Sequence, residues 1–319
     1  MLLMSQQQSR QPWKGLPMDS NGSRTRFHIF AHAVVLSVCW LSACTISTPS
    51  SAGEPAPDSL EALMFPQRVT PFVHGATQQP VDFEDAWRSN PAWVLANMSH
   101  TAYFDEKGIR KIMTSMGAPE CRVYDKNGAL GFLAVGPERV ILTFRGTEPN
   151  DANDILADLA FVPVKLETAE VHQGFLRELD RVWPDIVKDL DRLKSESPET
   201  RRFIVTGHSL GGAMATLAAT RFAFDEEVTF GEPRVGFKTE TIFKAKSHDR
   251  YINGDDMIPS VPPRITAGHH GKEIRVDGPT GKRDWRVDHA IVLYSLNLGA
   301  LHPTATPPDQ AAQPGTQPR

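Results

Sequence analysis

The chain has 319 residues, of which 40% are hydrophobic, and its formal net charge is −4. This length and composition are ordinary for a globular protein and fit one large domain or two small ones. An acidic chain without a basic stripe argues against a nucleic-acid-binding protein and against electrostatic adhesion to anionic lipid.

The N-terminal segment is typical of an export signal. Arg24 and Arg26 precede an apolar run at residues 33–44 that is too short to cross a bilayer as a helix. The run ends in Leu-Ser-Ala-Cys, which resembles the lipobox of bacterial lipoproteins, and the resemblance implies cleavage before Cys44 and attachment of lipid to its thiol. We therefore expect residues 1–43 to be a lipoprotein-type signal peptide. The mature protein would be exported and membrane-anchored, on the periplasmic or cell-surface side.

Three alternatives stay open for this segment. It can be the cleaved signal of a secreted protein, an uncleaved anchor or a buried helix, and Met18 is a second candidate start of translation. Removing residues 1–43 leaves a net charge of about −7 and, with Cys44 acylated, Cys121 as the one free thiol. The fold therefore needs no disulfide.

Two segments rich in Ser, Pro and Ala flank the predicted folded part. Residues 44–62 have the composition of a flexible tether and residues 302–319 that of a disordered tail. We expect one domain at residues 63–301, without internal repeats. No pattern indicates an oligomeric state.

Within this domain, short strand-like runs alternate with helical ones. The predicted strands are residues 130–136, 139–146, 202–207, 227–231, 250–253 and 272–277, and the predicted helices are 172–194, one from Ser209, 239–245 and 288–298. The first two strands are expected to form a hairpin, and Pro184 is a candidate kink in the first helix. Such alternation predicts an α/β fold with a mostly parallel sheet that is covered on both faces.

The sequence Gly207-His-Ser209-Leu-Gly211 stands where a strand passes directly into a helix. This pattern is typical of a nucleophile elbow, in which a strained turn presents the serine hydroxyl above the sheet. A Cβ at Gly207 or Gly211 is expected to collide with the neighbouring strand or helix. A phosphate-binding loop is the rival interpretation, but no lysine follows the glycines.

A serine hydrolase of this type needs an acid and then a histidine further along the chain. Asp255 and Asp256 follow a predicted strand, and His289 lies at a helix start. His269 and His270 are the alternative bases. Two adjacent histidines can suggest a metal, but no third ligand at a sensible spacing supports a metal site.

Six motifs resemble one family, the class 3 lipases, which comprise fungal-type triacylglycerol lipases and their bacterial and plant relatives. They are TFRGT, VHQGF, GHSLGG, TFGEPRVG, DDMIPSVPP and DHA, in the family's order and spacing. The resemblance covers residues 82–298 and implies an α/β-hydrolase fold. It also implies that Ser209 is the nucleophile, Asp256 the acid and His289 the base.

The oxyanion hole and the lid are expected around the same loop. The N–H after the nucleophile, that of Leu210, is one expected oxyanion donor; by resemblance, Thr147 is the other, while Arg145 makes a structural ion pair. The segment after Thr147 takes the place of the family's lid and is amphipathic, although an ordinary surface helix stays an alternative. Its expected lid residues are Asp151, Asp154, Ile155, Leu156, Asp158 and Leu159.

These features together predict a serine hydrolase that cleaves carboxylic esters of lipids through an acyl-enzyme, without a metal or an organic cofactor. Acylglycerol lipase is the leading activity, ahead of phospholipase A and of an esterase for short-chain or aromatic acids, because fold and triad do not determine the substrate. A catalytically silent, lipid-anchored binding protein is the alternative from a different class. An enzyme built on Cys121 is a distant third.

Overall fold

The structure is a computed structural model that describes residues 54–56, 58–72, 82–118, 120–147, 162–196, 201–276 and 284–301. The predicted signal peptide, Cys44, the predicted lid residues 151–159 and the predicted tail therefore lie outside the described residues, as does most of the predicted tether. No helix in the described ranges is long and apolar enough to cross a membrane.

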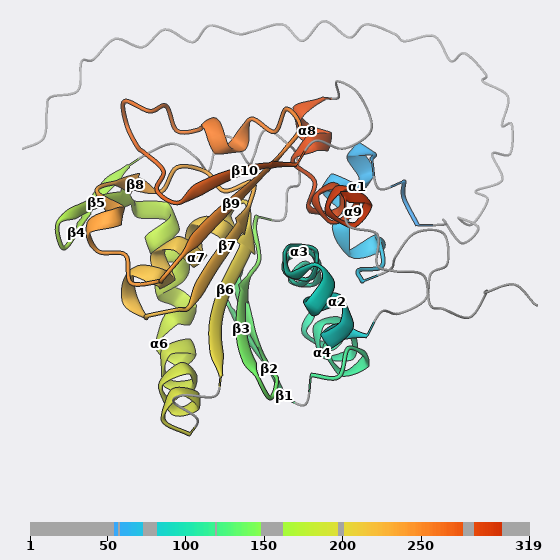
Figure 1. Ribbon diagram of the computed structural model, residues 1–319. Coiled ribbons are helices and arrows are strands. Elements are labelled where there is room, and N and C mark those ends of the chain that lie inside the picture. The colour runs from blue at the N-terminus through green and yellow to red at the C-terminus, as the bar shows by residue number, and fades with distance from the viewer. Residues whose placement is uncertain are drawn as a thin grey trace, which may run out of the picture. The chain divides into compact units, whose positions relative to one another are not determined.

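A seven-stranded sheet forms the centre of the described chain (Figure 1). In spatial order its strands are β1 (Glu120–Lys126), β2 (Ala129–Val135), β3 (Arg139–Phe144), β6 (Arg202–His208), β7 (Glu226–Phe230), β9 (His248–Asn253) and β10 (Lys272–Val276). The first three strands pair antiparallel as a meander, and every pair from β3 to β10 is parallel. The carboxyl ends of β6, β7 and β9 therefore point to the same edge of the sheet.

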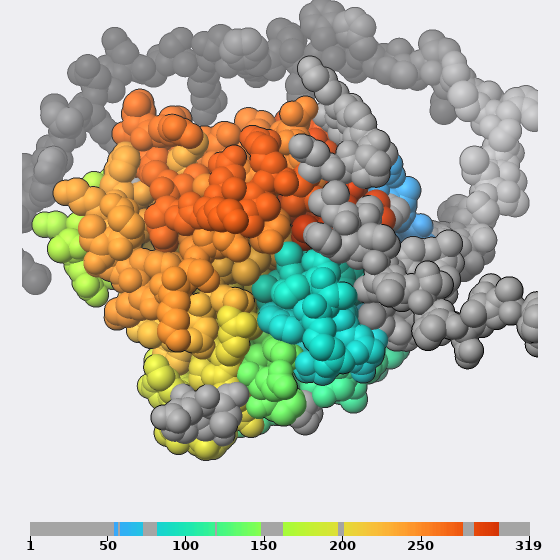
Figure 2. Space-filling model, in the orientation of Figure 1, coloured from blue at the N-terminus to red at the C-terminus, as the bar shows by residue number. Residues whose placement is uncertain are grey.

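Helices cover both faces of this sheet, as the alternation of elements predicts (Figure 1). One face packs against α6 (Gln173–Glu196) and α7 (Leu210–Arg221), and the other against α2 (Phe83–Ser89), α3 (Pro91–Thr101), α4 (Glu106–Ser115) and α9 (Ile291–Leu301). The buried strand β6 supplies both cores with alternate residues: Phe203 and Val205 face the first, and Ile204 the second. Figure 2 shows the teal α2–α3 region next to the yellow-to-orange, later part of the chain.

Shorter elements complete the described chain. A second, antiparallel sheet contains β4 (Pro163–Leu166), β5 (Ala169–His172) and β8 (Gly236–Phe237), and two short helices, α1 (Leu60–Met64) and α8 (Trp285–Asp288), contact each other. The single 3₁₀ turns are η1 (Pro66–Arg68), η3 (Thr239–Thr241) and η4 (Ile258–Ser260).

The structure confirms the α/β class, the mostly parallel sheet and the hairpin of β2 and β3. Two helix predictions were wrong in extent. The helix expected at residues 239–245 is a single 3₁₀ turn that follows the left-handed Lys238, at φ 59°. The closing helix is divided into α8 and α9, because the chain leaves the helix at His289 and Ala290. The sequence also did not reveal β1 or the second sheet.

Candidate active site

Ser209 occupies the turn between β6 and α7 with a strained backbone. Its φ of 56° and ψ of −126° lie in a region that residues other than glycine rarely adopt. The turn is held by the Ser209 N–H, which donates to the carbonyl of Phe230 at 2.9 Å. Ser209 is 4% exposed. This strand-turn-helix geometry is that of a nucleophile elbow.

The two flanking glycines allow the elbow to pack closely. A Cβ at Gly207 would lie 2.3 Å from the carbonyl of Gly211, and a Cβ at Gly211 would lie 2.3 Å from the carbonyl oxygen of Phe144. Both distances are far below van der Waals contact, and the obstacle in each case is backbone. The expected collisions are thereby confirmed.

Three buried side chains from the carboxyl edge of the sheet form a hydrogen-bonded chain. His289 Nε2 lies 3.0 Å from Ser209 Oγ, and His289 Nδ1 lies 2.8 Å from Asp256 Oδ2. In the neutral tautomer that donates from Nδ1 to the carboxylate, Nε2 is free to accept the serine proton. The structure therefore brings together the three residues that the sequence proposed as a triad.

The carboxylate of Asp256 has two further hydrogen-bond donors. The Ile258 N–H donates to Oδ1 at 2.9 Å, and the hydroxyl of Tyr294 donates to Oδ2 at 2.6 Å. Tyr294 is fully buried on α9, and burial, followed by the neighbouring Asp256, raises its pKa well above the usual value. Sequence reasoning missed this residue, because it lies within an apolar helix and belongs to no motif. Its proximity to Asp256 arises only when α9 packs against the sheet.

His208 contacts the backbone of His289, the histidine of the proposed triad. Its Nε2 lies 2.7 Å from the carbonyl oxygen of His289, and its Nδ1 lies 2.8 Å from the Tyr103 hydroxyl. Burial, followed by the neighbouring His289, holds the pKa of His208 well below its usual value, so the ring is neutral. Nε2–H must then donate to the carbonyl, and Nδ1 accepts from Tyr103.

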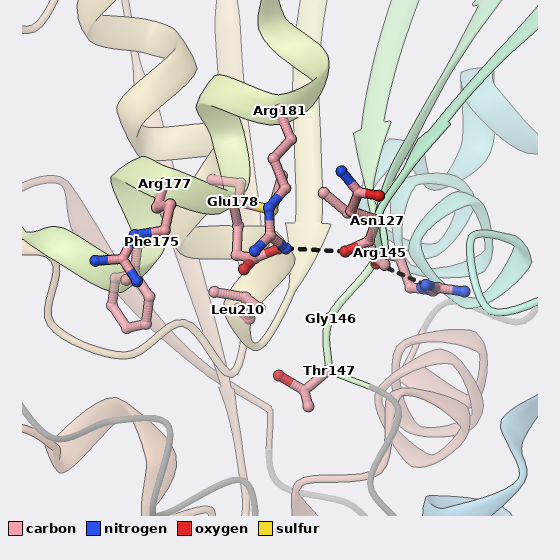
Figure 3. Close-up of a pocket in the computed structure, with 13 residues that line it drawn as sticks. Asn127, Arg145, Gly146, Thr147, Phe175, Arg177, Glu178, Arg181 and Leu210 are labelled. Atoms are coloured by element: carbon pink, nitrogen blue, oxygen red, sulfur yellow. Dashed lines mark hydrogen bonds and ion pairs between the residues drawn. The ribbon is translucent and has the colours of Figure 1, made fainter.

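The loop after β3 touches the elbow at Gly146. A Cβ on Gly146 would lie 2.3 Å from the Tyr103 hydroxyl and 3.2 Å from the Ser209 Cβ. This contact brings the next residue, Thr147, to a hollow of about 460 Å³ that Leu210 also lines (Figure 3). The N–H of Leu210, the first residue of α7, has no acceptor within its own helix. The two residues expected to supply the oxyanion donors therefore line the same hollow.

Two arginines that line this hollow donate hydrogen bonds to the turn between β1 and β2. Arg181 donates to the carbonyl of Asn127 at 2.9 Å and to Glu178 at 2.6 Å (Figure 3). Arg145 donates to the carbonyl of Gly128 at 2.8 Å. The arginine next to the expected oxyanion hole thus holds a neighbouring turn.

The competing residues from the sequence have other partners. The backbone N–H of Asp255 donates to Asp288, and it is Asp256 that meets His289. His269 Nε2 lies 2.8 Å from the Pro259 carbonyl, and His270 Nδ1 lies 3.1 Å from the Thr239 hydroxyl. Cys121 lies half-buried on β1, and burial raises the pKa of its thiol to about 11, so it is a poor nucleophile at neutral pH.

A buried charge network lies beneath β7 and β9. Glu227, His248 and His270 bring potential metal-ligand atoms within 4.8 Å of one another, an approach that sequence spacing did not suggest. His248 Nε2 lies 3.4 Å from Glu227 Oε1 and 3.3 Å from Glu232 Oε2. Burial opposes protonation of His248, but the two glutamates outweigh it and raise its pKa.

This network is balanced by the protein's own groups. A protonated His248 and Arg250 offset the charge of Glu232, and also that of Glu227 when Glu227 is ionised. A divalent cation beside Arg250 would therefore leave excess positive charge in a buried place. Burial raises the pKa of Glu227 to about 7. Burial also acts against ionisation of Glu232, but His248 prevails and lowers its pKa to about 2.

Comparisons with known proteins agree with this arrangement. The family model described as Lipase (class 3) matches residues 141–266, a stretch that includes Ser209 and Asp256. The "Secreted mono- and diacylglycerol lipase 1" of Fusarium solani is 37% identical over 131 residues, which are 38% of this chain and 39% of the relative. The "Lipase" of Rhizomucor miehei is 32% identical over 167 residues, 47% of this chain and 45% of the relative.

The match to these two curated relatives thus spans less than half of their length. Among solved structures, the Rhizomucor miehei triacylglyceride lipase is 26% identical and aligns with a TM-score of 0.44 over 50% of this chain and 65% of that chain. Over residues 141–266 the chain is thus similar to the class 3 lipases. Its mostly parallel sheet, with the strand-turn-helix elbow at Ser209, has the α/β-hydrolase fold.

Proposed function

We propose that this protein is a carboxylic ester hydrolase that cleaves lipid esters, with acylglycerols as its substrate class. The single observation that carries the proposal is the buried chain from Ser209 through His289 to Asp256, with contacts of 3.0 and 2.8 Å. The printed names of the relatives, a mono- and diacylglycerol lipase and a lipase, support the substrate class.

The reaction follows from the geometry. Ser209 Oγ attacks the ester carbonyl while His289 Nε2 takes the hydroxyl proton, and Asp256 stabilises the resulting imidazolium. The N–H groups of Leu210 and Thr147 would stabilise the negative charge on the carbonyl oxygen. The carbon–oxygen bond to the alcohol then breaks as His289 returns the proton to the leaving oxygen. Water, deprotonated by His289, attacks the acyl-enzyme and releases the carboxylic acid.

A substrate series tests this proposal. Emulsified and dissolved esters of increasing acyl length are offered to the full chain, to Ser209→Ala and to Ser195→Ala. Ser195 is an exposed serine at the end of α6 and serves as the matched control. We expect Ser209→Ala to lower kcat by about 10⁴- to 10⁶-fold and Ser195→Ala to keep the normal rate.

An equal rate for Ser209→Ala and the unaltered protein would overturn the triad. Failure of Ser209 to react with a fluorophosphonate would instead favour the silent binding protein. Preference for phospholipids, or for dissolved short-chain esters, would replace the acylglycerol assignment by a phospholipase A or a soluble-ester esterase.

We also propose that the protein is exported and anchored through Cys44, with residues 1–43 as the cleaved signal. The lipobox-like Leu-Ser-Ala-Cys supports lipid attachment, and the relative described as secreted supports export. Labelling of the expressed protein with a clickable palmitate analogue is expected to mark the unaltered chain and not Cys44→Ser. Equal labelling of both would contradict the anchor, and release of unlabelled protein would indicate simple secretion.

A further inference from the structure

A second hollow, of about 450 Å³, lies beside the acid of the proposed triad and is lined by four arginines. We call it the arginine pocket; its arginines are Arg234, Arg250, Arg264 and Arg275. Arg250 lies on β9 and Arg275 on β10, the last strand of the sheet (Figure 1). Arg264 lies between η4 and β10, and Arg234 lies in the loop between β7 and β8. Asp256 also lines this hollow, whereas Leu210 and Thr147 line the first one.

Arg250 lies in the wall of the pocket with part of its guanidinium unsatisfied. Its side chain is 7% exposed. Nε donates to the carbonyl of His270 at 3.0 Å, and Nη2 lies 3.6 Å from Glu273. Nη1 is buried and has no hydrogen-bond partner among the described residues. A buried N–H donor without an acceptor is costly, so an acceptor from solution would be stabilising there.

The pocket carries an excess of positive charge. Four arginines and two acidic residues, Asp256 and Glu273, line it, and the side chain of Asp256 is itself buried. The Asp256 carboxylate already accepts hydrogen bonds from His289, Tyr294 and Ile258, and Glu273 is about half exposed. Burial keeps His269 neutral by lowering its pKa to about 4. Deeper in the protein, Glu227 and Glu232 also face Arg250, but His248 lies between them as a cation.

This excess of positive charge affects the pKa of Arg234. Burial, followed by the charges of Arg264 and Arg250, lowers the pKa of Arg234. Such a concentration of cations is unusual in a chain whose net charge is −4. Guanidinium groups are planar forks of donors that match the oxygens of phosphate and carboxylate groups.

We propose that the arginine pocket binds a phosphate group, which accepts from Arg250 Nη1 and is held from the rim by Arg264 and Arg275. The phosphate is either a free ion or the head of a phosphorylated glycerol. Because the pocket wall includes the segment that carries Asp256, bound phosphate would stabilise the acid side of the triad. Binding does not depend on ester hydrolysis, so it is expected in Ser209→Ala as well.

Calorimetric titration of the full chain with inorganic phosphate, at constant ionic strength against chloride, tests the proposal. The test variant is Arg264→Ala/Arg275→Ala, which removes two exposed rim arginines. The control is Arg88→Ala/Arg110→Ala, which removes the same charge from exposed positions on α2 and α4. We expect phosphate to bind the unaltered and control proteins with similar Kd, and the rim variant to bind about tenfold more weakly or worse.

Glycerol 3-phosphate, with glycerol as its blank, distinguishes the two sources. Tighter binding than inorganic phosphate assigns the pocket to a phosphorylated head group, and weaker binding assigns it to the free ion. Absence of phosphate binding to the unaltered protein, or an equal loss of affinity in the control variant, overturns the proposal. Normal phosphate binding by an inactive Ser209→Ala separates this result from the fate of the proposed function.

Discussion

Tyr294 is the positioning residue of the proposed triad that no motif indicates. Its hydroxyl donates to the same oxygen of Asp256 that accepts from His289, at 2.6 and 2.8 Å. Tyr294→Phe removes this donor without changing the shape of the core. We expect kcat/KM for an ester to fall by about tenfold, because Asp256 becomes less well oriented, and the free energy of unfolding to fall by about 1 kcal/mol.

Tyr124→Phe is the matched control for this prediction. It removes a comparable hydrogen bond, that of the Tyr124 hydroxyl to Asp189 at 2.6 Å, outside the site. It is expected to lower stability and leave kcat/KM unchanged. A pH–rate profile that shifts in Tyr294→Phe alone would identify an effect on the Asp256–His289 pair. Equal kcat/KM in both variants and in the unaltered enzyme would show that Tyr294 is merely structural.

Local motifs indicate the three residues of the proposed triad, but not two tyrosines of the hydrogen-bond network around them. Ser209, Asp256 and His289 each stand in a short motif whose neighbours explain the local turn. Tyr103 and Tyr294 do not, since each meets its partner only through helix packing against the sheet. His248 and Glu227, whose side chains are close enough to be potential metal ligands, are likewise neighbours only because β7 and β9 pair in parallel.

At the scale of elements, the burial of a strand determined whether it could be predicted from the sequence. The strands β2, β3 and β6 are buried almost throughout, so their apolar runs identified them. The strand β1 lies at the edge of the sheet and is only partly buried, so its sequence shows no such run. The strands β4, β5 and β8 have only two to four residues each, and strands this short give no local signal. The pairing of β5 with β8 also joins segments about 65 residues apart in the chain.

The division between α8 and α9 has a structural reason that the apolar pattern concealed. Asp288, at the end of α8, accepts from the N–H of Asp255 at 2.8 Å, and its carbonyl accepts from Asn253 at 2.9 Å. These bonds tie the helix end to the loop that carries Asp256. Leaving the helix at His289 directs the imidazole between Asp256 and Ser209. An uninterrupted helix over residues 288–298 has no comparable anchor at its start.

At the scale of the whole molecule, buried histidines make stability depend on pH. Burial holds four of them neutral in the folded state, with pKa values of about 4 or well below the usual 6.5: His100, His208, His269 and His270. Below pH 6.5 the unfolded chain binds protons at these rings and the folded chain does not. Acid therefore favours unfolding, by about 1.4 kcal/mol per pH unit for each such ring.

Glu227 and His248 have the opposite effect on how stability depends on pH. The pKa of Glu227 is raised from 4.5 to about 7 and that of His248 is raised above 6.5, so the folded state retains these protons more tightly. Their contribution is fully present at low pH and is lost as pH rises through the folded pKa values. Below pH 6.5 Glu227 alone opposes the four histidines, so stability is expected to fall as the pH drops below that value. Above pH 6.5 the contribution of His248 is lost as the pH rises through its raised pKa.

Two variants separate these contributions between pH 4.5 and 6.5. His100→Gln removes one neutral buried histidine, whose Nε2 lies 2.7 Å from the Pro66 carbonyl, and its amide can still donate there. The free energy of unfolding, measured in urea, should then change less steeply with pH. The difference in slope should correspond to about one fewer proton taken up on unfolding. Glu227→Gln removes a group that binds a proton only in the folded state over this range, so the slope should steepen by about one proton. Equal slopes in all three proteins would mean that these buried groups titrate alike in the folded and unfolded chain, and that surface charge controls acid unfolding.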